Sequence, residues 1–196
     1  MRPRLWLARH GETDWSANGK HTGRTDVPLN ALGRKQAEAL GTGLERLGVK
    51  FDRAWTSPLG RAQETAALAG FPDAREMGDL VEWDYGEFEG RKTVDVRKEL
   101  GDPQWLIWTA DIRRGETPAD VGKRADRAIA TLLDDSDADN VIVFAHGHFL
   151  RIFAARWMGR EAACGQHLAL STGTLSILGY EHDYHVIDRW NAPVEE

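Results

Sequence analysis

Imidazole and guanidinium side chains directly follow short apolar runs in this chain. Residues 5–8 are apolar and lead into Arg9 and His10, and the apolar run 141–145 leads into His146. Runs of this length that stop at polar and glycine residues are typical of buried strands, so we expect these polar groups where strands end. Imidazole and guanidinium groups in such places suit nucleophilic chemistry on an anionic substrate.

Phosphoryl transfer is the chemistry that these residue types fit. It needs a nucleophile, fixed positive charge around the phosphate oxygens and an acid for the leaving oxygen. We predict His10 as the nucleophile, because a neutral imidazole nitrogen attacks phosphorus well once its tautomer is fixed. Glu82, at the end of a further predicted strand, is the candidate proton donor. Gly11 would let the backbone approach the phosphate closely.

The positive charge would come from Arg9, Arg61 and His146. Arg61 follows a strand predicted at residues 52–56. Arginine suits this role because its planar fork binds two oxygens at once and stays charged at neutral pH. The carboxyl ends of parallel strands meet at one edge of a sheet, where ligands bind in open α/β folds. The three charged groups should therefore gather in one place.

Each of these residues also has an ordinary structural interpretation. A lone histidine at a strand end is more often structural, Arg61 alone would be a solvated helix residue, and Glu82 alone would be a surface acid. His146 and His148 could be half of a metal site, although no third ligand follows at a suitable spacing. The functional interpretation depends on all of these residues lying at strand ends of one sheet.

Strands and helices alternate along the chain. The pattern predicts an α/β fold: a three-layer sandwich with a mostly parallel central sheet, helices on both faces and a C-terminal hairpin. Ser57 is the expected N-cap of the second helix, with Pro58 at its first position. Residues 12–30 are expected to be loop. The expected helices cover residues 31–47, 57–69, 93–100, 117–133 and 147–158, and the hairpin covers 175–180 and 184–190.

Composition limits the partners. The 196 residues carry a formal charge of -6, which argues against nucleic acid or an anionic membrane as the main partner. We expect a small phosphorylated metabolite instead. The single cysteine excludes an intrachain disulfide, and no apolar run approaches a membrane span, so a cytoplasmic location is expected. The length suits one domain, residues 1–196, and the terminal hairpin offers an edge for a homo-oligomer.

Several motifs together resemble the histidine phosphatase superfamily, which includes phosphoglycerate mutases and many phosphatases. They run through most of the chain in the order typical of that superfamily. The matching segments are residues 7–15 (LARHGETDW), 22–23 (TG), 26–29 (DVPL), 32–37 (LGRKQA), 56–66 (TSPLGRAQETA), the loop 82–90 and 144–148 (FAHGH).

The resemblance implies a role for each candidate. His10 would accept the phosphoryl group and Glu82 would protonate the leaving alcohol. No metal or organic cofactor would be needed, and water would hydrolyse the phosphohistidine. Many members have Asn where this chain has Ser16, so Ser16 is retained as a candidate contact only. The groups implied to bind phosphate or substrate are Arg9, Ser16, Thr22, Gly23, Arg61, His146 and Gly147.

The resemblance is greatest to a subgroup of small phosphatases that includes bacterial acid phosphatases and fungal sedoheptulose-1,7-bisphosphatase. Mutases of the superfamily are longer and cover the site, which keeps water from the phosphohistidine. Here residues 91–116 are the candidate for a small cover, which favours hydrolysis. Phosphatase is therefore predicted, with sugar phosphates as the expected substrates. A phosphoglycerate mutase and an inactive phosphate-binding protein on the same fold are the alternatives.

Overall fold

The computed structural model describes residues 2–134 and 138–193. The strands of this described part form one mixed sheet. They are β1 (Arg4–Arg9), β2 (Arg53–Thr56), β3 (Arg75–Glu76), β4 (Asn140–Ala145), β5 (Leu175–Glu181) and β6 (Tyr184–Ala192). Their order across the sheet is β3-β2-β4-β1-β5-β6. The first four are parallel, and β5 and β6 form the antiparallel hairpin at one edge.

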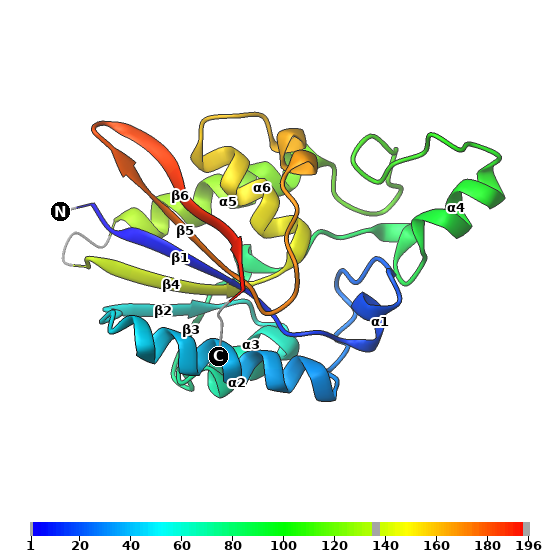
Figure 1. The fold of residues 1–196 in the computed structure, drawn as a ribbon. Helices are drawn as coiled ribbons and strands as arrows, with labels where there is room; N and C mark the ends of the chain where they lie inside the picture. Colours follow the sequence, from blue (N-terminus) through cyan, green and yellow to red (C-terminus); the bar gives the residue numbers. More distant parts are fainter. Residues whose placement is uncertain (1, 135–137, 194–196) are drawn as a thin grey trace.

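Helices cover both faces of this sheet (Figure 1). On one face lie α2 (Ala31–Leu47) and α3 (Gly60–Leu68), and on the other lie α5 (Pro118–Leu133) and α6 (Gly147–Trp157). Successive residues of β1 point to opposite faces: Leu5 and Leu7 pack with α5 and α6, whereas Trp6 and Ala8 pack with α2 and α3. The predicted three-layer sandwich with a mostly parallel sheet is confirmed.

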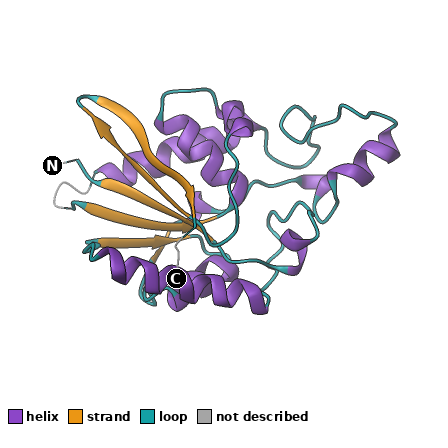
Figure 2. Ribbon diagram, in the orientation of Figure 1, coloured by secondary structure: helices purple, strands orange, loops and turns teal. Residues whose placement is uncertain are grey.

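The carboxyl ends of the central strands meet at one edge of the sheet. Arg9 lies opposite Ala145 in the parallel pair of β1 and β4, and the His10 amide donates to the Ala145 carbonyl. The helix α6 begins directly after β4, so its N-terminus and its unpaired amides lie at the same edge. Beyond that edge lie α1 (Asp14–Ala17) and α4 (Thr93–Leu100), as Figure 2 shows.

Two local expectations were wrong. Residues 12–30 are not all loop, because Thr13 caps the short helix α1 in a capping box with Ser16. Ser57 does not cap α3, which begins at Gly60 and has no side-chain cap. The Ser57 hydroxyl is hydrogen-bonded to His146 Nε2 at 2.8 Å and accepts from the Leu59 amide. Ser57 therefore positions His146, and α3 begins without a side-chain cap.

No helix in residues 2–134 and 138–193 is long and apolar enough to cross a membrane.

Candidate active site

His10 is held by a hydrogen bond at one of its ring nitrogens. Its Nδ1 lies 2.7 Å from the Gly11 carbonyl oxygen, which can only accept, so Nδ1 carries the proton. The lone pair therefore resides on Nε2. Burial, followed by the neighbouring charges of Arg61 and Arg9, keeps the pKa of His10 well below its ordinary value. The imidazole is thus neutral and has the tautomer that a nucleophile needs.

Gly11 is required by a backbone contact that the sequence did not indicate. A Cβ at this position would lie 2.2 Å from the carbonyl oxygen of Gly33, at the start of α2. The Gly11 amide donates to the Thr65 hydroxyl on α3. The glycine therefore brings the strand end of His10 against α2 and α3, and this packing accounts for it without a phosphate contact.

Arg9 has a buried donor that no described residue satisfies. One amino group of its guanidinium donates to the Leu170 carbonyl, whereas its Nε is buried with no hydrogen-bond partner among residues 2–134 and 138–193. Gly147 makes room for this side chain, since a Cβ there would lie 3.1 Å from Arg9 Cζ. An unsatisfied guanidinium donor in a buried place costs free energy, and a bound oxyanion would relieve that cost.

Glu82 is fixed by main-chain amides. Its Oε1 accepts from the amides of Trp83 and Phe149, at 2.9 and 2.8 Å, and its Oε2 accepts from the His148 amide at 3.0 Å. Two of these amides belong to the first turn of α6, where helix geometry leaves them without an intrahelical partner. The side chain therefore has one defined position at the rim of the sheet.

Arg61 and His146 form a buried layer behind His10. The Nε of Arg61 donates to His146 Nδ1 at 3.2 Å, and its amino groups donate to the carbonyls of Thr22, Gly23 and Thr25. Both side chains are fully buried, and the rings of His146 and His10 lie 5.2 Å apart. Direct contact of these two residues with phosphate stays a prediction, because in this structure their donors hold the loop 22–25 and Ser57.

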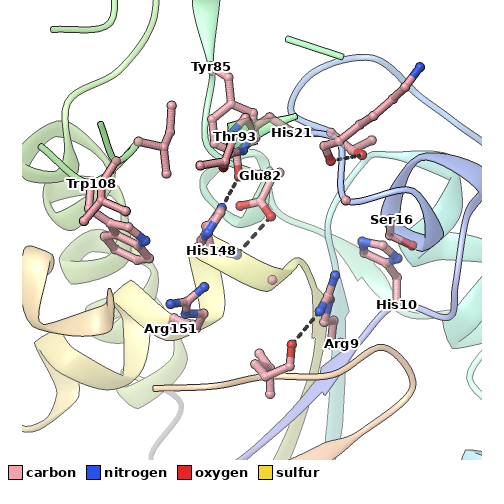
Figure 3. A pocket seen from close by; sticks show the side chains of 17 residues that line it. Arg9, His10, Ser16, His21, Glu82, Tyr85, Thr93, Trp108, His148 and Arg151 are labelled. Atoms are coloured by element: carbon pink, nitrogen blue, oxygen red, sulfur yellow. Dashed lines mark hydrogen bonds between the residues drawn. The ribbon is translucent and has the colours of Figure 1, made fainter. Parts of the chain in front are cut away.

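A cavity of about 290 Å³ opens beside His10 (Figure 3). Of the other residues predicted to bind phosphate, Gly23 lies outside the lining and its amide donates to Glu89. Ser16 lines the cavity while its hydroxyl serves the cap of α1. The predicted site residues that the cavity brings together are Arg9, His10, Ser16, Thr22, Glu82 and Gly147.

The far wall of the cavity contains residues absent from the predicted site. Tyr85, Trp108, His148 and Arg151 line it, together with His21. The Tyr85 hydroxyl is hydrogen-bonded to His148 Nδ1. The sequence could have indicated that His148 and Arg151 lie together, since residues three apart on a helix share a face. Tyr85 had no such signal, because its approach depends on how the segment 85–116 folds over the sheet edge.

Part of the segment 91–116 lines this cavity, and its role as a cover stays a prediction. Thr93, Leu106, Ile107 and Trp108 belong to its lining. Trp105 is buried against Phe88 and the His21 ring instead, so the two tryptophans differ in role. Burial lowers the pKa of His21 to about 4, so this imidazole is neutral near neutral pH.

His146 and His148 do not converge on a common point. The ring nitrogens of His146 face Arg61 and Ser57, and Nδ1 of His148 faces Tyr85. In the part of the chain that the structure describes, no group of three or more His, Cys, Asp or Glu side chains is placed to hold a metal ion.

The family follows from comparison with known proteins. The family model of the histidine phosphatase superfamily (branch 1) matches residues 5–193. The chain belongs to this superfamily. Its fold agrees with a solved structure of an open reading frame from Mycobacterium tuberculosis, with a TM-score of 0.92, 38% identity and full coverage of both chains.

The relatives of this histidine phosphatase include named phosphatases. An acid phosphatase of Mycobacterium tuberculosis is 42% identical over 91% of this chain and 87% of its own length. Sedoheptulose 1,7-bisphosphatase of Saccharomyces cerevisiae is 36% identical over 81% of this chain and 69% of its own. A phosphoglycerate mutase of Rhizobium etli is 38% identical over 75% of each. Family and phosphatase relatives together support a phosphoric monoester hydrolase.

Proposed function

We propose that this protein is a metal-independent phosphatase that hydrolyses small phosphate monoesters, with sugar phosphates as the favoured class, through a phosphohistidine on His10. The observation that carries the proposal is the hydrogen bond from His10 Nδ1 to the Gly11 carbonyl, which leaves Nε2 as the nucleophile. Arg9 and the carboxyl group of Glu82 line the same cavity. These groups supply the charge and the acid that the reaction needs.

The chemistry then follows in two steps. The Nε2 lone pair of His10 forms a bond to phosphorus while the ester P–O bond breaks, and Glu82 gives its proton to the leaving oxygen. The guanidinium of Arg9 and the amide of Gly147, at the N-terminus of α6, hold the phosphoryl oxygens. Water next attacks the phosphohistidine and passes a proton to Glu82, which restores both groups.

The test is steady-state turnover of p-nitrophenyl phosphate, with and without EDTA. We expect His10→Ala to lower kcat at least about 10⁴-fold, because it removes the nitrogen that attacks phosphorus. His182→Asn, in the exposed turn between β5 and β6, is the matched control and should turn over as the wild type does. Turnover by the Ala variant at the wild-type rate would contradict the proposal, as would loss of activity in EDTA that a metal restores.

The same protein samples distinguish a phosphatase from a phosphoglycerate mutase. Hydrolysis predicts release of inorganic phosphate from 2,3-bisphosphoglycerate or 3-phosphoglycerate. A mutase instead interconverts 3- and 2-phosphoglycerate faster than it releases phosphate, because the phosphoryl group returns to the substrate. A ratio of isomerisation to hydrolysis above one would overturn the phosphatase assignment.

A further inference from the structure

The loop 22–25 is bound from two sides. On one side, the amino groups of Arg61 donate to three of its carbonyl oxygens, at 2.8, 2.9 and 3.3 Å. On the other side, Glu89 Oε1 accepts from the amides of Gly23 and Thr25, at 2.9 and 3.0 Å. The carbonyls of the loop thus face a guanidinium, and two of its amides face a carboxylate.

Glu89 lies close enough to the loop to bind both amides with one oxygen atom. A Cβ at Gly23 would lie 2.4 Å from Glu89 Oε2 and 2.5 Å from the Trp83 carbonyl oxygen, so only glycine fits there. Glu89 directly follows the short 3-10 helix η2 (Gly86–Phe88), in the segment that also contains Glu82. The contact therefore joins this loop to the segment of the proposed acid.

This loop forms part of the cavity wall. Thr22 lines the cavity, and its hydroxyl donates to the Lys20 carbonyl at 3.2 Å. His21, directly before the loop, also lines the cavity, and its Nε2 lies 3.3 Å from the Thr93 hydroxyl oxygen (Figure 3). A displacement of the loop would therefore alter the shape of the cavity beside His10.

Arg61 connects the loop to the nucleophile. Its Nε donates to His146 Nδ1 at 3.2 Å, and the rings of His146 and His10 lie 5.2 Å apart. Burial lowers the pKa of Arg61, and nearby carboxylates, including that of Glu89, oppose this shift. A guanidinium is a rigid planar fork, so the position of the loop carbonyls also sets the direction of the Nε donor.

We propose that Glu89 is a positioning residue for the transfer of the phosphoryl group to His10. By accepting from the two amides, it keeps the loop carbonyls on Arg61, and the Arg61 Nε in turn holds His146 beside the nucleophile. Glu89 is not among the described residues that line the cavity, so it acts through the loop and makes no contact with the substrate. This role rests on the proposed function, because it concerns the same reaction at the same site.

The test uses variants of Glu89 that separate hydrogen bonding from charge. In Glu89→Gln, the side-chain amide oxygen can still accept from both loop amides, although the charge is lost. Glu89→Asp keeps the charge, but its carboxylate is one methylene further from the loop, and Glu89→Ala removes the acceptor entirely. Glu87→Ala, which removes an exposed carboxylate two residues earlier, is the control.

The measurements are kcat and KM for p-nitrophenyl phosphate, with the urea midpoint of each variant to establish that it is folded. We expect kcat to fall about 10- to 100-fold in Glu89→Ala and about tenfold in Glu89→Asp, because small displacements of groups around a reacting centre lower the rate. Glu89→Gln should retain kcat to within about threefold, because both amides keep their acceptor. Glu87→Ala should turn over as the wild type does.

The order of the variants distinguishes amide binding from charge. A higher kcat in Glu89→Asp than in Glu89→Gln would overturn the proposal, and this comparison remains if Glu89→Ala does not fold. Wild-type kcat in Glu89→Ala, or a loss confined to KM, would also overturn it. If one of these results occurs while the wild type still forms phosphohistidine at His10, the proposed function stands. If the wild type hydrolyses no ester, both fail.

Discussion

At the scale of single residues, the protein fixes protonation by the choice of hydrogen-bond partner. The Gly11 carbonyl sets the tautomer of His10, and the Nε of Arg61 together with the Ser57 hydroxyl sets that of His146. A carbonyl can only accept and a guanidinium can only donate, so each neighbour permits one tautomer. The two histidines are similar in burial but differ in which nitrogen carries the proton, Nδ1 in His10 and Nε2 in His146.

Glu82 gives a prediction at this scale. In Glu82→Gln, the leaving oxygen must depart without a proton. We expect kcat for alkyl phosphates such as glycerol 3-phosphate to fall about 10²-fold or more, and kcat for p-nitrophenyl phosphate to fall much less, because a nitrophenolate needs little protonation. The measurement is kcat for both esters in the wild type and the variant.

The comparison of the two esters in Glu82→Gln also shows whether the substitution disturbs the structure of the site. A glutamine amide placed near the His148 amide would disturb both substrates alike, since the two donors repel. Equal slowing of both esters would therefore count against Glu82 as the acid and indicate a positional role.

At the scale of elements, an ion pair between a buried arginine and a partly buried glutamate holds the segment that contains Glu82. Arg124 on α5 binds Glu116 through two nitrogens and donates to the carbonyls of Asp79, Val81 and Glu82. Glu116 in turn accepts from the Asp84 amide. The chain from 79 to 84 is thus tied to a helix although η1 (Gly78–Leu80) is its only regular structure in the described residues.

Arg124→Met should accordingly lower the free energy of unfolding by about 3–5 kcal/mol, because it leaves Glu116 and three carbonyls without their donor. Urea denaturation of the variant and the wild type measures this difference. Arg127→Met, one turn later on α5, removes an exposed pair with Asp79 and should change the urea midpoint far less. Similar midpoints for the two variants would contradict the role given to Arg124.

The elements also show what the sequence could predict. The runs 5–8 and 141–145 predicted β1 and β4 because buried parallel strands are apolar throughout, and the residues after them were placed correctly at the sheet edge. The cap of α1 was missed, because Thr13 with Ser16 departs from the usual box ending in Glu or Gln. The place of Tyr85 in the cavity wall could not be predicted, since it depends on tertiary packing.

At the scale of the whole molecule, burial of neutral histidines at one sheet edge makes stability depend on pH. Burial lowers the pKa of His10, His146 and His148, and lowers that of His21 to about 4. In the unfolded chain these groups take up protons below about pH 6.5, whereas in the folded protein they do not. The unfolded state therefore binds more protons, so stability is lost as the pH falls from about 6.5 toward 4.

We expect the free energy of unfolding to decrease between pH 7 and pH 5, by up to about 1.4 kcal/mol per pH unit for each such histidine. Urea titrations at several pH values give the slope. In His21→Gln, the decrease in the free energy of unfolding per pH unit should become smaller, because one group that takes up a proton on unfolding is gone. This change distinguishes the contribution of the histidines from that of the carboxylates. A stability that stays constant from pH 7 to pH 5 would show that these histidines are not buried as neutral groups.

The covalent intermediate is the most direct test of the whole account. The protein is mixed with a phosphate ester, quenched within milliseconds and analysed by mass spectrometry of its peptides. We predict a phosphoryl group on His10 that is labile in acid and stable in base, as expected for a phosphorus–nitrogen bond. We predict no phosphorylated peptide in His10→Ala. A phosphoryl group on another residue, or turnover without any phosphoenzyme in the burst phase, would contradict the account.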